Sequence, residues 1–523
     1  MFFTPRSLLR GVLLFLSLFM FMNLNLKGIL ALRGISNSEC DEDGNMSQAS
    51  SKTEEEKKLK WWQLSLLGVA GTIGTGYFLG SGLAISIGGP AVLLVYILAA
   101  VGTYVVFDAL AQMTAEHPEQ GSFRSYAKKA FGSWAGFGSG WVYWFSELLI
   151  MGSQLTALSI FSRFWFPSVP MWVFAAGFGA LSLLIVFFGN KGFDRVENVL
   201  AIIKVAAIIM FLLLAAALLA GWIGSSKYTP KLPQSRHELF PTGGIGLWSA
   251  FIFAFYAYGG IEVLGIMSYR LRKPEEAPKA GKVMLLALAV VYVVSIGLAV
   301  TMVPLTAFNP KESPFVLALR SDHLPFVPHL FNGVLIIAGF STMTASLYAI
   351  TSMMITLAQE GDAPRLFSKK WKEKYPFYAL CLIAAGLMGA IIMSLWLPGK
   401  VFEYITTAAG LMILYNWSFI LLSSGRLLKQ NKLSGAKRWV GLLLIGAAVT
   451  GTLFHKLSRP GFYISLLIVS LIALSDWIVQ YRRNKKSEPV QKSENEETNR
   501  EYRSMPGGPE FRIKGIRMRK SKL

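Results

Sequence analysis

Two glycine-rich runs are the residues in this chain most suited to binding a small charged ligand. The first is Gly71-Thr72-Ile73-Gly74-Thr75-Gly76. Nothing strand-like precedes it and no Lys-Ser/Thr pair follows it, so it is neither a Walker A loop nor a dinucleotide fingerprint. Each glycine weakens a helix by roughly 1 kcal/mol relative to alanine. The run predicts either close helix packing through small residues or a break whose free N–H groups face an anion.

The second run is Phe255-Tyr256-Ala257-Tyr258-Gly259-Gly260-Ile261-Glu262. Paired glycines and an acid lie near the middle of an apolar segment there. Two glycine-interrupted segments at corresponding places indicate an inverted repeat with a central binding site. The two halves of the chain show no convincing residue-level similarity, so this inference rests on the positions of the breaks.

Three ionisable residues inside apolar segments are candidates for proton coupling, namely Lys204, Glu147 and Glu262. Lys204 lies nine residues beyond Arg195, or about 13 Å along a helix, so snorkelling to the headgroups is difficult. A buried lysine can lose its proton, and proton coupling needs a group that alternates between charged and neutral. The competing interpretations are a lysine paired with backbone carbonyls and two carboxyls with structural hydrogen bonds.

The composition requires that these residues be held by membrane-spanning helices. Of the 523 residues, 53% are hydrophobic and 15% are charged, against about 25% charged in a soluble domain. The net charge of +21 would suggest nucleic acid in a soluble chain, but the basic residues lie mainly in loops between apolar segments. Two cysteines and five scattered histidines provide neither a disulfide framework nor a metal cluster. We therefore expect no cofactor, no metal, no nucleic-acid partner and no enzymatic activity.

The fold class that we predict is an all-α polytopic membrane protein, with the lipid bilayer as its environment. Its twelve expected spans are 62–84, 89–113, 134–162, 171–188, 196–221, 245–268, 281–306, 328–358, 378–397, 402–424, 437–455 and 460–480.

Loop charge predicts the orientation of these spans. Basic residues concentrate in the loops at 124–129, 191–195, 270–282, 365–374 and 426–438, and alternate loops carry far fewer. The positive-inside rule then places both termini in the cytoplasm, in a multi-pass protein of the cell membrane. Residues 46–61 read as a polar cytoplasmic tail, and 481–523 as a disordered cytoplasmic tail.

Residues 1–45 do not fit this topology. If the apolar stretch 11–26 were a cleaved signal peptide, the next segment would start outside, against the loop charges. If it were a thirteenth helix, the N-terminus would lie outside. The simpler interpretation is that translation starts at Met46 and that 1–45 come from an upstream start. A genuine extra hydrophobic segment is the alternative.

In the order and spacing of its motifs, the chain resembles amino acid permeases of the amino acid–polyamine–organocation superfamily, in the bacterial and fungal amino acid transporter branch. The resemblance extends from about Trp61 to Arg426. The stretches that carry it are Gly71 to Gly76, Pro118 with Gly121-Ser122-Phe123, Gly140 to Trp144, Ile203-Lys204-Val205, Tyr258 to Glu262, Leu357 to Pro364 and Trp417 to Arg426.

This resemblance implies helices one and six broken within a five-plus-five inverted repeat. The first repeat would cover 62–221 and the second 245–424, with helices eleven and twelve at 437–480. Amides around Gly74, Thr75 and Gly76 would hold a substrate carboxylate, and carbonyls near Ile73 and Phe255 would take its ammonium. The remaining candidate contacts are Tyr256, Tyr258, Gly259 and Ser341, with Thr342 beside the last.

The function implied is secondary active import of an amino acid by alternating access. In sodium-coupled relatives of this fold, a cation sits between helices one and eight near helix five, and the resemblance implies that Lys204 supplies that charge here. We expect proton symport of neutral amino acids, small hydroxylated ones such as threonine or serine among them. Substrate exchange and an amino acid receptor are the alternatives.

Overall fold

The computed structural model describes residues 59–504, except for 120, 188–189, 223–227, 229, 231, 269–270, 310, 322–323, 370–375, 397–399 and 430. The predictions for residues 1–45, for the tail before Leu59 and for the last residues of the C-terminal tail lie outside this part. Within it, all regular structure is helical, and a single isolated bridge joins Leu59 and Leu271. The all-helical prediction is therefore confirmed for the described residues.

Within the part of the chain that the structure describes, eight helical segments are long and apolar enough to cross a membrane, or nine if one bent pair counts as a single span. They lie in α6 (Val92–Glu116), α8 (Ser133–Arg163), α10 (Asn190–Leu219), α12 (Gly243–Ala257) with α13 (Ile261–Met267), α14 (Ala277–Met302), α16 (Val327–Gln359), α18 (Val401–Leu427) and α20 (Arg459–Ser504). The first member of the bent pair is α3 (Trp61–Thr72). The second is the segment Thr75–Gly88, which comprises α4 (Thr75–Phe78) and α5 (Gly80–Gly88).

The remaining helices are shorter or more polar. They are α7 (Ser122–Phe131), α9 (Met171–Phe187), α11 (Arg236–Leu239), α15 (Pro314–Ala318), α17 (Phe377–Trp396) and α19 (Lys432–Gly451). Both α9 and α17 include apolar stretches of fewer than 18 residues. The chain is therefore a multi-pass membrane protein, while the count of twelve spans stays a prediction.

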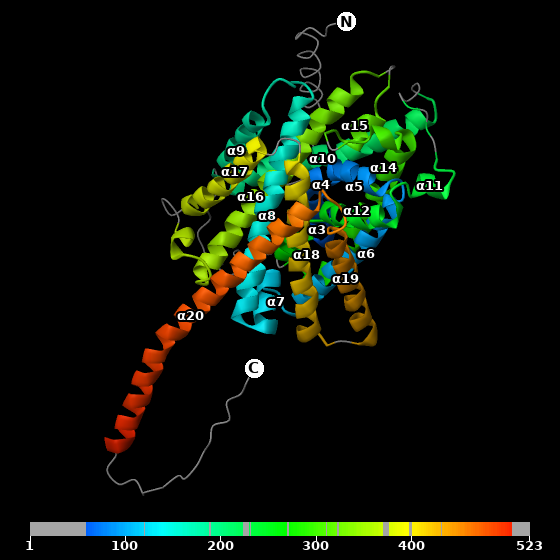
Figure 1. Cartoon of the computed structure of the whole chain (residues 1–523). Coiled ribbons are helices and arrows are strands. Elements are labelled where there is room, and N and C mark those ends of the chain that lie inside the picture. Colours follow the sequence, from blue (N-terminus) through cyan, green and yellow to red (C-terminus); the bar gives the residue numbers. More distant parts are fainter. Residues whose placement is uncertain are drawn as a thin grey trace, which may run out of the picture. The chain divides into compact units, whose positions relative to one another are not determined.

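Long helices surround the broken ones. The helix α8 packs along α16 and α18, α14 packs along α6 and α3, and α12 packs on α5, α6 and α18. Figure 1 shows the short helices α3, α4 and α12 among these long helices. Lipid tails are as apolar as the side chains, so close packing rather than the hydrophobic effect holds such helices together. Gly281 shows this closeness, because a Cβ there would lie 1.7 Å from the Phe107 ring.

A buried arginine fastens α7 to the segment after α16. Arg124 is fully buried, and it donates to Glu360 at 2.5 Å and to the carboxylate of Asp362. Lys128 reaches the other oxygen of Glu360 at 2.9 Å. Burial alone would raise the pKa of Glu360, but its bonds and charge contacts with Arg124 and Lys128 outweigh burial and hold that pKa below its ordinary value.

We expect Arg124→Ala to destabilise the protein by about 3–5 kcal/mol, because it leaves the buried Asp362 carboxylate without its cation. Thermal unfolding of the detergent-purified protein measures this change in stability. The loss of the monodisperse peak in size-exclusion chromatography with rising temperature gives the midpoint. Lys128→Ala is the matched control, since Lys128 is 44% exposed and should change stability by less than about 1 kcal/mol. Equal midpoints for Arg124→Ala and the wild type would contradict the expectation.

The same cluster has a defined pH response. Because the pKa of Glu360 is lower in the folded than in the unfolded chain, its stabilisation is complete above the ordinary value of 4.5. It is lost as the pH falls through the lower, folded-state value. The difference in midpoint between wild type and Glu360→Gln should accordingly shrink on acidification and stay constant between neutral and alkaline pH.

A backbone hydrogen bond joins the start of α3 to the segment that follows α13. The N–H of Arg272, which follows α13, donates to the carbonyl of Leu59, which precedes α3, at 2.9 Å. The two residues Leu59 and Leu271 form the isolated parallel bridge. The ends of α3 and α13 that point away from the two breaks are therefore tied to each other.

Candidate functional site

The predicted interruption of the first span is present. The helix α3 ends at Thr72 and α4 begins at Thr75, and the axis turns by 52° between Trp61–Thr72 and Thr75–Gly88. Ile73 and Gly74, between them, have extended backbones with ψ of 108° and −157°. Extended residues cannot continue the helical hydrogen-bond ladder, so both half-helices present unpaired backbone groups here.

These unpaired groups have opposite polarity on the two sides of the break. The carbonyls of Gly71, Thr72 and Ile73 accept no hydrogen bond from the residues that the structure describes. On the other side, the amides of Gly74, Thr75 and Gly76 donate none within the same residues. Carbonyls attract an ammonium, and the amides and dipole of a helix N-terminus attract a carboxylate.

The second predicted interruption is also present. The helix α12 ends at Ala257 and α13 begins at Ile261. Gly260 between them has φ of 110°, in the left-handed region that glycine enters without strain. The carbonyls of Phe255 and Tyr256 accept the amides of Tyr258 and Gly259 at 3.0 and 3.1 Å. The end of α12 therefore satisfies the Phe255 carbonyl internally, unlike the end of α3.

Glu262 organises this second break. One of its carboxylate oxygens accepts the Gly260 N–H at 2.9 Å, and the other accepts the indole N–H of Trp417 in α18. The side chain is almost fully buried. Glu262 thus caps α13 and links it to α18, and its proton-coupling role stays a prediction.

We expect Glu262→Gln to impair transport more than expression, because a neutral amide weakens two charge-assisted bonds at a backbone break. Such bonds contribute about 1.5–3 kcal/mol each, so the transport rate should fall roughly tenfold or more. Initial uptake rates normalised to the amount of purified protein measure this. Trp417→Phe serves as the partner control, since it removes only one of the bonds. Normal transport by Glu262→Gln at all pH values would contradict the expectation and show that transport does not need the acid.

Both breaks open onto one cavity of about 80 Å³. Its polar lining includes Gly74, Thr75 and Gly76 from the first break and Gly259 and Gly260 from the second. The rest of the wall comes from Glu147, Ile150 and Gln154 in α8, Tyr256 in α12, Thr342, Ala345 and Ser346 in α16, Ile413 in α18, and residues of α3 and α13. We call this the central cavity.

The structure brings about half of the predicted site residues to this cavity. Gly74, Thr75, Gly76, Tyr256, Gly259 and Glu147 line it, whereas Ile73, Phe255, Tyr258, Ser341, Glu262 and Lys204 do not. Thr342 lines the cavity in place of its fully buried neighbour Ser341. The lining residues Ile150 and Ile413 were not predicted, because they belong to uninterrupted helices without a local sequence signal.

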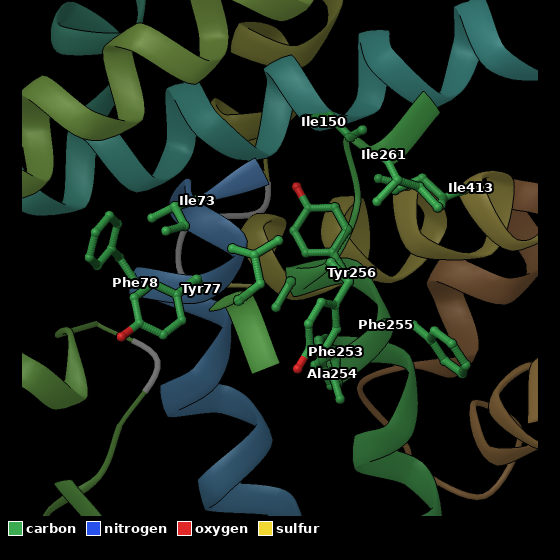
Figure 2. Close-up of a cluster of buried hydrophobic side chains, with 14 of the residues drawn as sticks. Ile73, Tyr77, Phe78, Ile150, Phe253, Ala254, Phe255, Tyr256, Ile261 and Ile413 are labelled. Atoms are coloured by element: carbon green, nitrogen blue, oxygen red, sulfur yellow. The ribbon is translucent and has the colours of Figure 1, made fainter. Parts of the chain in front are cut away.

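Tyr256 forms one wall of the central cavity. It extends from α12 toward α8 (Figure 2). Its hydroxyl and that of Ser153 lie 2.5 Å apart in a hydrogen bond. Figure 2 also shows Ile73, Ile150 and Ile413 arranged around this tyrosine. A Cβ on Gly76 would lie 2.9 Å from the Tyr256 ring. Glycine at position 76 is therefore what allows the ring to cover the first break.

Several buried polar atoms around the cavity lack a protein partner. The hydroxyls of Thr72 and Thr75 and the side-chain oxygen of Gln154 make no hydrogen bond with the residues that the structure describes. All three side chains line the cavity. Buried polar groups are normally paired, so this set indicates that a polar ligand belongs there.

Lys204 contacts the last turn of α3, just before the first break. Its ammonium, fully buried on α10, donates to the Ala70 carbonyl at 2.9 Å. Ala70 belongs to the last turn of α3, whose carbonyls are released by the break. A buried basic side chain is therefore bonded directly to one of the half-helices.

The sequence of this chain is similar to those of known transport proteins. The model of the amino acid permease family matches residues 63–475. A Bacillus subtilis (strain 168) protein described as an uncharacterised transporter, YcgH, is 50% identical over 445 residues, which are 85% of this chain and all of the relative. The aromatic amino acid transport protein AroP of Corynebacterium glutamicum is 30% identical over 80% of this chain and 94% of its own length. AroP of Escherichia coli (strain K12) is 29% identical over 79% and 92%. The chain therefore belongs to the amino acid permease family, within the superfamily that its motifs resemble, and this is a family of transporters rather than of enzymes.

Proposed function

We propose that the protein imports a neutral amino acid across the cell membrane by alternating access, in symport with a proton. The proposal includes twelve spans in a five-plus-five inverted repeat, with both termini in the cytoplasm. One observation carries it: unpaired amides and unpaired carbonyls of a single helix break border the same buried cavity. A zwitterion has the two charges that such a break can hold.

In this proposal the substrate carboxylate binds the amides of Gly74, Thr75 and Gly76, and the Thr75 hydroxyl adds a bond. The α-ammonium binds the carbonyls of Gly71 and Thr72, which line the central cavity. The Phe255 carbonyl is a weaker candidate than expected, because it already accepts the Tyr258 amide. Thr72 and Gln154 supply further hydrogen-bonding groups to the ligand.

The substrate side chain would face an apolar wall. Ile150, Val263, Ala345 and Ile413 line the cavity away from the backbone groups of the first break. Such a wall suits a neutral side chain better than a charged one. The relatives named for aromatic amino acids make phenylalanine, tyrosine and tryptophan the first candidates, ahead of threonine and serine.

For coupling, we propose that Lys204 carries the transported proton. The protonated ammonium holds the last turn of α3 through the Ala70 carbonyl. Loss of the proton weakens this bond, since a neutral amine donates less strongly than an ammonium. The half-helix α3 could then swing and release the substrate. Glu147, which lines the central cavity within hydrogen-bonding reach of Ser346, is the second candidate carrier.

The test is uptake of labelled amino acids into proteoliposomes, with and without an inward proton gradient. Accumulation of a neutral amino acid that needs the gradient supports symport. Exchange predicts uptake that needs internal amino acid but no gradient. Binding without any uptake would favour a receptor and overturn the proposal. Lysine and arginine are included, because Glu147 in the wall could instead pair with a cationic side chain.

A further inference from the structure

A second and larger cavity lies near the C-terminal end of α8. Its volume is about 450 Å³, within the range of small-molecule sites. Its wall includes Thr156, Ile160 and Phe161 of α8, Asn332 of α16, Phe402 and Glu403 of α18, and the segment Lys311 to Ser313. We call it the α8–α18 cavity. None of its lining residues lines the central cavity.

The two cavities follow one another along α8. Glu147, Ile150 and Gln154 line the central cavity, and Thr156 and Ile160, further along the helix, line the second one. The hydrogen bond between Ser153 and the wall residue Tyr256 joins α8 to α12 within the stretch that lines the central cavity. In the proposed orientation, the α8–α18 cavity is on the outer side of the central cavity.

The α8–α18 cavity contains a carboxylate without a cation. Glu403 is 3% exposed, lies in the first turn of α18, and has one oxygen that is buried and unbonded within the described part of the chain. Lys400, three residues earlier, is exposed; its charge acts on Glu403, but the two form no ion pair within the described residues. By contrast Glu312, in the same cavity, is bonded to Arg320 at 2.7 Å. A buried, unpaired carboxylate is costly, so the site favours a ligand that brings a positive charge.

The other polar groups of the cavity suit the rest of an amino acid. The Ser313 hydroxyl is buried and unbonded among the described residues, so it can donate to the ligand. Arg163 and Lys311 are exposed and add positive charge to the wall. Between these groups the wall is apolar, with Phe161, Phe164 and Phe402.

We propose that the α8–α18 cavity is a second, outer binding site for an amino acid, whose α-ammonium pairs with Glu403. The inference deepens the proposed function, because its ligand is the class of molecule that the protein would import. An amino acid held there would lie on the outer side of the central cavity, on the path of a molecule that enters from outside.

The experiment separates the two sites with the variant Gly76→Leu, which fills the central one. Purified Gly76→Leu protein is tested for equilibrium binding of each of the common amino acids in radiolabelled form. At least one should still bind, and adding Glu403→Gln should weaken that binding by about tenfold or more. Glu312→Gln in the same background is the matched control and should leave binding within about twofold, because its carboxylate already has a partner.

Absence of binding for every amino acid, or binding that Glu403→Gln leaves unchanged, overturns the proposal. If Gly76→Leu does not fold, the wild-type chain gives the same answer, since Glu403→Gln should halve its binding stoichiometry. Uptake distinguishes this inference from the proposed function. Binding through Glu403 in a protein that transports nothing would defeat the transport proposal alone, and uptake with unchanged binding in Glu403→Gln would defeat only the outer site.

Discussion

Lys204→Ala should bind substrate and yet fail to accumulate it against a gradient. The alanine removes the ammonium that donates to Ala70, but it changes none of the residues that line the central cavity. Substrate affinity should therefore stay within about tenfold of the wild type, while the link between protonation and α3 is lost. Lys204→Arg should fail in the same way, because guanidinium does not deprotonate.

Two assays on the same proteoliposomes check this expectation. Counterflow, which needs binding and exchange but no driving force, should persist in Lys204→Ala, whereas accumulation driven by a proton gradient should vanish. Lys279→Ala is the matched control: Lys279 lies 4.2 Å from the Trp61 ring at the start of α3 but is exposed, and its loss should leave accumulation intact. Protonophore-sensitive accumulation by Lys204→Ala would refute the role and direct attention to Glu147 and Glu262.

Gly74→Leu and Gly76→Leu should abolish substrate binding in the central cavity without preventing membrane insertion. A Cβ on Gly74 would lie 2.9 Å from two atoms of Thr342, and one on Gly76 would lie 2.9 Å from the Tyr256 ring. The larger leucine side chain must occupy the space in front of the amides. Losing two charge-assisted hydrogen bonds of about 1.5–3 kcal/mol each corresponds to a hundredfold or greater loss of affinity.

Equilibrium binding of the best-transported amino acid, measured in a Glu403→Gln background that weakens the outer site, measures this loss. Gly80→Ala is a suitable control, since Gly80 is on the same half-helix and a Cβ there comes no nearer than 4.0 Å to the Thr75 carbonyl. It should bind normally. Wild-type affinity in both leucine variants would reduce the two glycines to packing residues and remove the main support for the carboxylate site.

The sequence predicted the breaks because glycine acts locally. Gly74 and Gly260 interrupt apolar segments, and no partner from elsewhere in the chain is needed to see that. The depth of Lys204 was likewise a matter of counting along one helix. Its acceptor, Ala70, could not be predicted, because nothing in an alanine signals that its carbonyl will be released and then paired.

Contacts between helices that are distant in the chain could not be predicted from the sequence. Ser341 and Thr342 are adjacent hydroxyl residues about 100° apart around α16, and only the rotation of that helix decides which lines the cavity. Glu262 was correctly identified as a residue at a break, but its partner Trp417 is 155 positions away. Arg124 looked like one more cytoplasmic cation until packing brought Glu360 and Asp362 to it.

The bridge between Leu59 and the segment after α13 couples the motion of α3 to that of α13. One end of α3 is held by the Arg272 amide, and the turn nearest its other end by Lys204. A change at Lys204 frees only one of these attachments, so α3 cannot swing without pulling on α13. The protection of the Arg272 N–H against exchange with deuterated water therefore reads out how often the two half-helices separate. A single backbone amide thus reports on the motion of one half-helix from each break.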